Sequence, residues 1–248
     1  MRLKDTVIIV TGSARNIGRV YALGLAREGA KVVVADIRDP EPTAQEIRGQ
    51  GGEALALRVD VTSRQATEEM ARRTVERFGR IDGLINNAAL FHDLVLKPFY
   101  QVEEEEWDRL MSINVKGLFL CAKAVFPQMK AQASGRIINI ASNTVFKGTT
   151  GFIHYVTSKG AVIGFTRALA REVGEYGINV NAVAPDYIPH EKDDRERPEW
   201  DLMIQASRCI KRREVPQDVL GTIIFLCSSD SDFITGQTIL VNGGSVHY

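Results

Sequence analysis

The sequence contains little of what marks several large classes of protein. Only three cysteines, Cys121, Cys209 and Cys227, occur among its 248 residues, and they form neither a C-x-x-C pair nor a metal-ligand spacing. Scattered thiols in odd number are typical of a reducing cytoplasm rather than of a disulfide framework. We therefore expect a cytoplasmic protein without a metal site.

Charge of one sign, long apolar runs and repeats are also missing. Lysine plus arginine and aspartate plus glutamate both number 31, which gives a formal net charge of zero. A chain without net charge has no general electrostatic attraction for nucleic acid or for an anionic membrane surface. We find no signal peptide, no apolar span of about 18 residues and no low-complexity segment. Neither nucleic acid nor a membrane is therefore expected as a partner.

What the sequence does contain is a regular alternation of apolar, β-branched runs with helical patterns. We predict strands at 6–10, 31–35, 54–59, 81–85, 136–141, 179–184 and 237–241. Helical patterns between them include 64–78, 103–130 and 216–227. This alternation predicts an α/β fold, a doubly wound seven-stranded parallel sheet with helices on both faces. The length suits a single domain over residues 1–248.

The chain is organised around the stretch from Ser142 to Lys159, which joins a buried strand to a helix. Tyr155 and Lys159 are four residues apart, so their side chains share one helix face. Ser142 lies where the strand ends, at the sheet edge where α/β proteins bind ligands. A phenol has a pKa near ~10, and a neighbouring cation favours its ionised form. Tyr155 can then accept the proton of an alcohol while hydride leaves the carbon.

A glycine-rich turn follows the first strand and precedes a helix. It reads Thr11-Gly12-Ser13-Ala14-Arg15-Asn16-Ile17-Gly18. Such a turn lets a pyrophosphate approach backbone N–H groups at the helix N-terminus. Asp36 ends the second strand, about 20 residues further on, where a carboxylate can accept both ribose hydroxyls of an adenosine. Together these features predict a dinucleotide cofactor.

With these residues assembled, the chain resembles the short-chain dehydrogenase/reductase family, whose members have a Rossmann-type fold. The shared motifs are T-G-x-x-x-x-x-G, Asp36, Asp60, Asn86-Asn87-Ala88, Asn114, Ser142 and Tyr155-x-x-x-Lys159. The resemblance implies a catalytic tetrad of Asn114, Ser142, Tyr155 and Lys159. It also implies cofactor contacts from Gly12, Arg15, Asn16, Ile17, Gly18, Asp36, Asp60, Val61, Asn87, Tyr155, Lys159, Pro185 and Ile188. A homotetramer and a substrate lid near residues 187–210 are implied in the same way.

Four positions depart from the family pattern. Asn16 stands where a glycine is usual, and Asn tolerates left-handed backbone better than most residues. Ala89 replaces the last glycine of N-N-A-G, and Asp186 replaces the glycine after Pro185. His190 falls where a threonine often contacts the nicotinamide. The last two departures affect the cofactor lid rather than the catalytic group.

The cofactor predicted is NAD, because Asp36 repels the 2′-phosphate of NADP. One such charge pair at ~4 Å is worth about 4 kcal/mol at an effective dielectric near 20. Arg15 and Arg38 act in the opposite direction, whereas Ile37 lacks the basic group that NADP-dependent enzymes favour.

The substrate predicted is a secondary alcohol or its ketone. Several segments resemble bacterial NAD-dependent 1-arylethanol dehydrogenases, and aromatic or soft side chains suit an aryl pocket. These are Phe91, Phe146, Phe152, Tyr187, Trp200 and Met203, with Asn143, His154, His190, His247 and Tyr248 as partners for a ring hydroxyl. We expect the substrate pocket to be lined from residues 91–94, 143–152 and 187–205. We therefore expect 1-(4-hydroxyphenyl)ethanol or 4-hydroxyacetophenone to be preferred.

Three alternatives remain open. A pyridoxal 4-dehydrogenase-like enzyme is one. A 3-oxoacyl-carrier-protein reductase is another, which would want NADPH and a basic surface; Lys211-Arg212-Arg213 is the only compact basic run. A cofactor-sensing binding protein is the third, although the complete set of tetrad residues argues against it.

Overall fold

The computed structural model describes residues 1–91, 94–189 and 198–247. Its centre is a seven-stranded parallel sheet with the strand order β3-β2-β1-β4-β5-β6-β7. The strands are β1 (Val7–Thr11), β2 (Lys31–Asp36), β3 (Ala54–Arg58), β4 (Gly83–Asn86), β5 (Gly135–Ile140), β6 (Ile178–Pro185) and β7 (Thr238–Val241). The order reverses between β1 and β4, which creates a crevice at the carboxyl edge of the sheet. The predicted fold class is confirmed.

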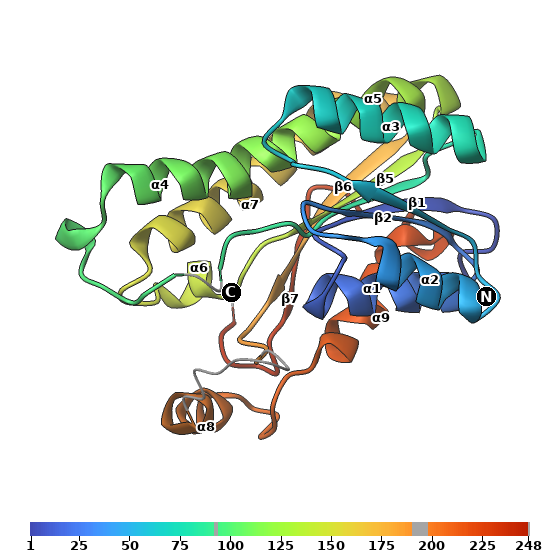
Figure 1. Ribbon diagram of the computed structural model, residues 1–248. Helices are drawn as coiled ribbons and strands as arrows, with labels where there is room; N and C mark the ends of the chain where they lie inside the picture. The colour runs from blue at the N-terminus through green and yellow to red at the C-terminus, as the bar shows by residue number, and fades with distance from the viewer. Residues whose placement is uncertain (92–93, 190–197, 248) are drawn as a thin grey trace.

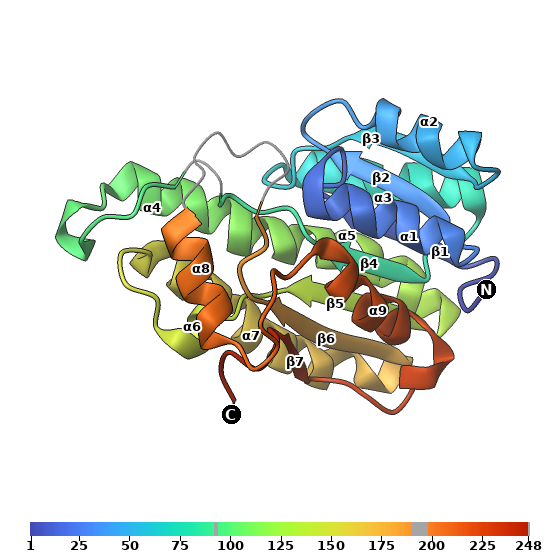
Figure 2. The same ribbon diagram turned by 90° about the horizontal axis from the view of Figure 1, so that it is seen from below.

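Helices cover both faces of the sheet (Figures 1 and 2). One layer contains α1 (Asn16–Arg27), α2 (Glu41–Gly49) and α9 (Pro216–Cys227). The other contains α3 (Arg64–Phe78), α5 (Gly117–Gln132) and α7 (Ile153–Val173). Each layer buries one apolar cluster against the strands, which is why β1 is buried along its whole length.

Some element boundaries differ from those expected. The helices at 64–78 and 216–227 begin and end as predicted. Helix α1 was expected to follow the glycine turn, but it begins at Asn16, inside that turn. The predicted helix 103–130 divides into α4 (Glu104–Met111), a π-helical turn (Ser112–Lys116) and α5. Short elements escaped the sequence patterns, namely α6 (Thr144–Lys147) and the 3₁₀ turns Phe99–Gln101, Gly174–Tyr176 and Ser229–Ser231.

One helical stretch corrects the expectation about apolar spans. Residues Glu104–Gln132 are long and apolar enough to cross a membrane, judged by length and composition alone. In this protein 44% of the apolar window is buried. Cys121, Val125 and Met129 of α5 contribute to the core beneath the sheet, which explains why the stretch is apolar.

Helix α8 (Pro198–Ser207) lies within the predicted lid region. Directly after it, Arg208 belongs to a cluster of charged side chains that we call the Asp186 cluster. It consists of Lys147, Asp186, Arg208 and Glu214. The Asp186 carboxylate accepts hydrogen bonds from Lys147 Nζ at 2.9 and 3.0 Å and from Arg208 Nε at 3.2 Å. Arg208 also donates to the Tyr187 carbonyl at 2.9 Å. The cluster therefore connects the end of β6 to α6 through Lys147 and to the segment after α8 through Arg208 and Glu214.

Glu214 is the least satisfied member of the Asp186 cluster. Its Oε2 accepts from the Asp186 backbone N–H at 3.1 Å and lies 3.6 Å from Arg208, but Oε1 has no partner among the described residues. Burial raises the pKa of Glu214 to about 8, although Arg208 opposes this shift. The folded protein consequently holds a proton at Glu214 that the unfolded chain releases near pH 4.5.

Replacement of this carboxyl group changes the pH dependence of stability. Because the folded-state pKa is raised, Glu214 stabilises the protein most below its unfolded pKa, and this stability is lost as the pH rises towards 8. Glu214→Gln should remove that loss, which we expect to be on the order of a few kcal/mol. Urea denaturation of both proteins between pH 5 and 9 measures it. Glu175→Gln, at an exposed position, is the control; parallel pH profiles of wild type and Glu214→Gln would contradict the assignment.

Candidate active site

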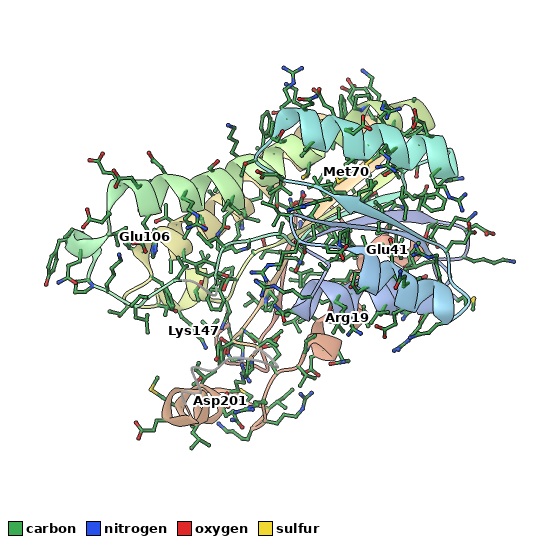
Figure 3. All side chains as sticks on the ribbon, in the orientation of Figure 1. Arg19, Glu41, Met70, Glu106, Lys147 and Asp201 are labelled. Atoms are coloured by element: carbon green, nitrogen blue, oxygen red, sulfur yellow. The ribbon has the colours of Figure 1, made fainter. Side chains whose placement is uncertain are left out.

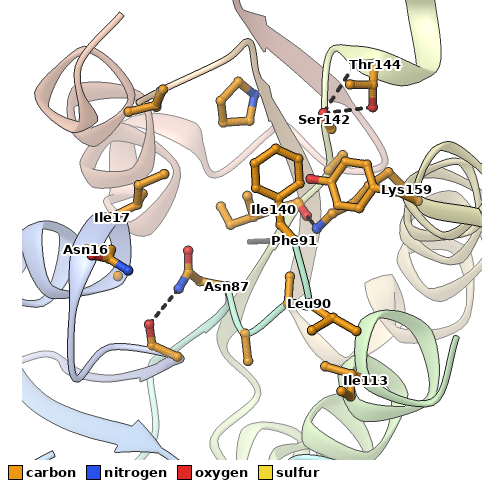
Figure 4. A pocket seen from close by; sticks show the side chains of 18 of the residues that line it. Asn16, Ile17, Asn87, Leu90, Phe91, Ile113, Ile140, Ser142, Thr144 and Lys159 are labelled. Carbon is orange, nitrogen blue, oxygen red and sulfur yellow. Dashed lines mark hydrogen bonds between the residues drawn. The ribbon is translucent and has the colours of Figure 1, made fainter. Parts of the chain in front are cut away.

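A cavity of about 1030 Å³ opens at the carboxyl edge of the sheet. Its walls come from the β1–α1 turn, the ends of β4, β5 and β6, the start of α7 and α8. Figure 4 shows the side chains converging on it from these separate elements. All of the predicted cofactor residues line this one cavity, as do Ser142, Tyr155 and Lys159.

The reactive end of the cavity is formed by α7 and the segment after β5. Tyr155 and Lys159 are 7% and 4% exposed, and the Lys159 ammonium lies 5.7 Å from the centroid of the Tyr155 ring. Lys159 Nζ donates to the Ile140 carbonyl at 2.7 Å. Ser142 Oγ accepts from the Thr144 hydroxyl at 3.0 Å and is hydrogen-bonded to Tyr155. The three predicted side chains are therefore neighbours.

Burial sets the protonation of this group. It raises the pKa of Tyr155 to about 12, although the hydrogen bond with Ser142 acts in the opposite direction. Burial also lowers the pKa of Lys159 to about 8. We expected the cation to bring the phenol pKa down, but desolvation is the larger effect in this structure. At neutral pH Tyr155 is thus a phenol that can donate a proton.

Asn114 does not line the cavity but contacts α7, the helix that carries Tyr155 and Lys159. It is 2% exposed within the π-helical turn. Its Oδ1 accepts from the Leu90 N–H at 2.7 Å, and its Nδ2 donates to Ser158 Oγ at 3.1 Å. Asn114 therefore joins the segment after β4 to α7, and its side chain positions the site.

The cofactor end is shaped by close backbone approach. A Cβ on Gly18 would lie 2.1 Å from the Gly12 carbonyl oxygen, so no larger residue fits. Asn16 has φ +56°, the left-handed conformation predicted for it. Asn87 Nδ2 donates to the carbonyls of Thr11 and Gly12 at 2.9 and 3.0 Å and fixes the turn against β4. The turn leaves the α1 N-terminus without a side-chain cap, which suits a pyrophosphate.

Acidic side chains mark the far end of this region. Asp36 accepts from the backbone N–H groups of Ala14 and Arg38, both at 2.9 Å, one on each carboxylate oxygen. Each oxygen retains a lone pair for a ribose hydroxyl. Asp60 uses Oδ1 to hold Thr62 and also borders the cavity. The glycine turn, the uncapped N-terminus of α1 and the Asp36 carboxylate together fit an adenine dinucleotide.

The residues predicted for an aryl pocket separate into two groups. Phe91, Phe152, Tyr187 and Met203 line the cavity. Phe146 instead packs against the core, and His154 is fully buried beside Glu106 with 3.0 Å between Nε2 and Oε1. Asn143 donates to Ser245 Oγ at 2.8 Å and does not line the cavity. The Trp200 side chain, His190 and Tyr248 lie outside the described residues.

Several residues of the cavity wall were not predicted. They include Leu90, Arg109, Ile113 and Ser245. Thr144, Lys147 and Thr149 fall in the segment 143–152, and Ile204 falls in the segment 187–205, both of which were expected to line the substrate pocket. Among the described residues, no three His, Cys, Asp or Glu side chains gather as metal ligands.

Comparison with known proteins places this geometry in a family. Residues 12–246 match the family model described as enoyl-(acyl carrier protein) reductase. The chain is 39% identical over 239 residues to a 3-oxoacyl-(acyl-carrier-protein) reductase of Staphylococcus epidermidis, covering 95% of this chain and 97% of that protein. It is also 39% identical to the hydroxy(phenyl)methylsuccinyl-CoA dehydrogenase subunit BbsD of Thauera aromatica, covering 98% of each.

A solved structure agrees with these sequence matches. Levodione reductase superimposes with a TM-score of 0.92 at 31% identity, and the match covers 100% of both chains. The motifs, the cavity and the relatives therefore agree, and the chain belongs to the short-chain dehydrogenase/reductase family of oxidoreductases.

Proposed function

We propose that the protein is an NAD(H)-dependent oxidoreductase that interconverts a ketone and its secondary alcohol. The observation that carries the proposal is the cavity itself, with Ser142, Tyr155 and Lys159 at one end and Asp36 at the other. Bound nicotinamide would supply or accept hydride there. A proton donor beside a hydride site is what reduction of a carbonyl requires.

Each residue has a separate task in this mechanism. The Ser142 and Tyr155 hydroxyls bind the substrate oxygen, and Tyr155 gives it a proton during reduction. Lys159 then stabilises the phenolate that remains, since an opposite charge favours the ionised form. One Lys159 N–H is used by the Ile140 carbonyl, which leaves two donors for the nicotinamide ribose. Asn114 keeps α7 in register with the segment after β4.

Tyr155→Phe tests the proton transfer. The ring remains to pack against Phe91 and Phe152, but the hydroxyl is lost. We expect kcat to fall by at least about 100-fold, in line with general acid catalysis, while NADH still binds. Steady-state kinetics and fluorescence titration of NADH measure the two effects, with the exposed Tyr100→Phe as control. A kcat within a few-fold of wild type would refute the role of Tyr155.

Asp36 supports the choice of NAD(H). Its carboxylate is 8% exposed and points its charge towards the place where an adenosine ribose would lie. A 2′-phosphate there would face like charge at close range. Ile37, which is 57% exposed, offers no compensating cation.

Removal of this charge should relax cofactor choice. We expect wild-type kcat/KM to be on the order of several hundredfold higher with NADH than with NADPH, from one unfavourable charge pair. Asp36→Asn keeps an oxygen for the Arg38 N–H and should reduce that ratio about tenfold or more. Asp39→Asn, a nearby carboxylate that holds only Glu41, is the matched control. An equal rate with NADPH in the wild type would show that Arg15 and Arg38 dominate.

Two substrate classes have support. Relatives 38–39% identical to this chain are 3-oxoacyl-carrier-protein reductases, which favours a 3-oxoacyl thioester. The aromatic cluster favours an aryl ketone, because Phe91 lies 5.0 Å from Tyr155 and 6.0 Å from Phe152 between ring centroids. The name of BbsD combines a phenyl ring with a CoA thioester. We place the thioester first and the aryl ketone second.

The basic run gives little support to docking of an acidic carrier protein. Arg212 pairs with Asp218, and Arg213 pairs with Asp201. Lys211 donates to the Ala206 carbonyl at 2.7 Å. Because both arginines are paired, the run presents little unpaired positive charge to an acidic carrier protein. A CoA-type thioester is therefore the substrate that we favour over a thioester on a carrier protein.

A substrate panel separates the classes. It contains acetoacetyl-CoA, an acetoacetyl carrier protein, acetophenone and 4-hydroxyacetophenone, each with NADH and NADPH. We expect the highest kcat/KM with acetoacetyl-CoA and NADH. A clear advantage of the aryl ketones would reverse the order of the two classes, and no turnover of any ketone would refute the proposed function. Little difference is expected between the two aryl ketones, since His154 and Asn143 are engaged elsewhere.

A further inference from the structure

The Asp186 cluster borders the substrate side of the cavity. Lys147 and Asp186 both belong to the cavity wall, whereas Arg208 lies behind them and is 2% exposed. Lys147, which is labelled in Figure 3, is the last residue of α6. The mechanism proposed above uses none of these charged groups, although burying them is costly unless they are paired.

The cluster carries more positive than negative charge. Asp186 is one carboxylate shared by two cations, Lys147 and Arg208. Burial would raise the pKa of Asp186, but its hydrogen bond from Lys147 brings that pKa below the ordinary value, so Asp186 is ionised. Glu214, on the other side of Arg208, has a pKa of about 8 and is mostly neutral at pH 7. One positive charge is therefore left without a full partner.

Lys147 is the member that can reach a ligand. Its side chain is 24% exposed, against 6% for Asp186 and 2% for Arg208. Two of its hydrogen bonds go to Asp186, which holds the ammonium in place and leaves a third N–H, uncommitted among the described residues. The hydroxyl-bearing residues Thr144, Thr149 and Ser245 also line the cavity.

We propose that Lys147 binds an anionic group of the substrate, a carboxylate or a phosphate, while the ketone of the same molecule lies at Tyr155. This inference rests on the proposed function, because the proposed function places the reacting ketone at Tyr155, away from the anionic group at Lys147. It makes Lys147 a specificity-determining residue that the family motifs do not contain. Asp186, where the family has a glycine, is the group that fixes the ammonium at this wall.

Matched pairs of substrates test the subsite. Methyl 4-acetylbenzoate and 4-acetylbenzoate differ in a carboxylate, whereas acetoacetyl-N-acetylcysteamine and acetoacetyl-CoA differ in phosphates. We expect wild type to favour the anionic member of at least one pair by about 10–100-fold in kcat/KM, as for a hydrogen bond to a charged group. The pair that responds identifies the source of the anion.

Three variants separate charge from structure. Lys147→Gln can still donate to Asp186 but has no charge, so the preference ratio should fall about tenfold or more. Lys147→Arg keeps the charge and should retain most of the ratio. Lys4→Met, at an exposed position, should leave the ratio unchanged. No anionic preference in wild type, or a preference that persists in Lys147→Gln, would overturn the proposal.

Direct binding keeps this result independent of turnover. Calorimetric titration of the NAD⁺ complex with 4-acetylbenzoate and with its methyl ester compares the two probes without reaction, because a ketone cannot accept hydride from the oxidised cofactor. Tighter binding of the acid by wild type, lost in Lys147→Gln, would support the subsite even if no ketone were reduced. Equal binding of the two probes, together with no difference within the thioester pair, would refute it. Absence of turnover alone would count against the proposed function.

Discussion

Burial of the Lys159 ammonium is the constraint on which the site depends. A cation that is 4% exposed is unfavourable in a protein interior unless its surroundings supply polar partners. The structure supplies the Ile140 carbonyl at the end of β5, the ring of Tyr155 and the open cavity. The ammonium can keep its charge only while β5 and α7 hold this arrangement. The catalytic geometry and the packing of the sheet are consequently one requirement.

The same burial explains why Tyr155 is a phenol in this structure. Desolvation acts on both groups in the direction of their neutral forms, so it raises the pKa of the phenol and lowers that of the ammonium. The sequence suggested only the attraction between the pair, because spacing on a helix face reveals proximity but not depth. The depth of Tyr155 depends on Leu94 and Leu110, which pack in the same apolar cluster from other parts of the chain.

Sequence patterns predicted the parts of the molecule that local residues determine. The parallel seven-stranded sheet with helices on both faces follows from alternating apolar runs, and the glycine turn with Asn16 adopts the backbone that its residues favour. The π-helical turn at Asn114 could not be predicted in this way. It depends on hydrogen bonds to Leu90 and Ser158, which lie 24 and 44 residues away. His154 was misassigned for the same reason, since only the fold reveals its contact with Glu106.

This difference between local and long-range contacts also divides the cavity. The glycine turn at the cofactor end is built from backbone and from residues that are close in sequence, such as Gly12 and Gly18, so motifs describe it well. The substrate end is built from pairs that are distant in sequence, such as Lys147 with Asp186 and Arg208 with Asp186. Relatives can share every motif of the cofactor end while differing in the contacts that form the substrate end. The motifs therefore establish the family, whereas the choice of substrate that we propose depends on the contacts around Asp186 and Phe91.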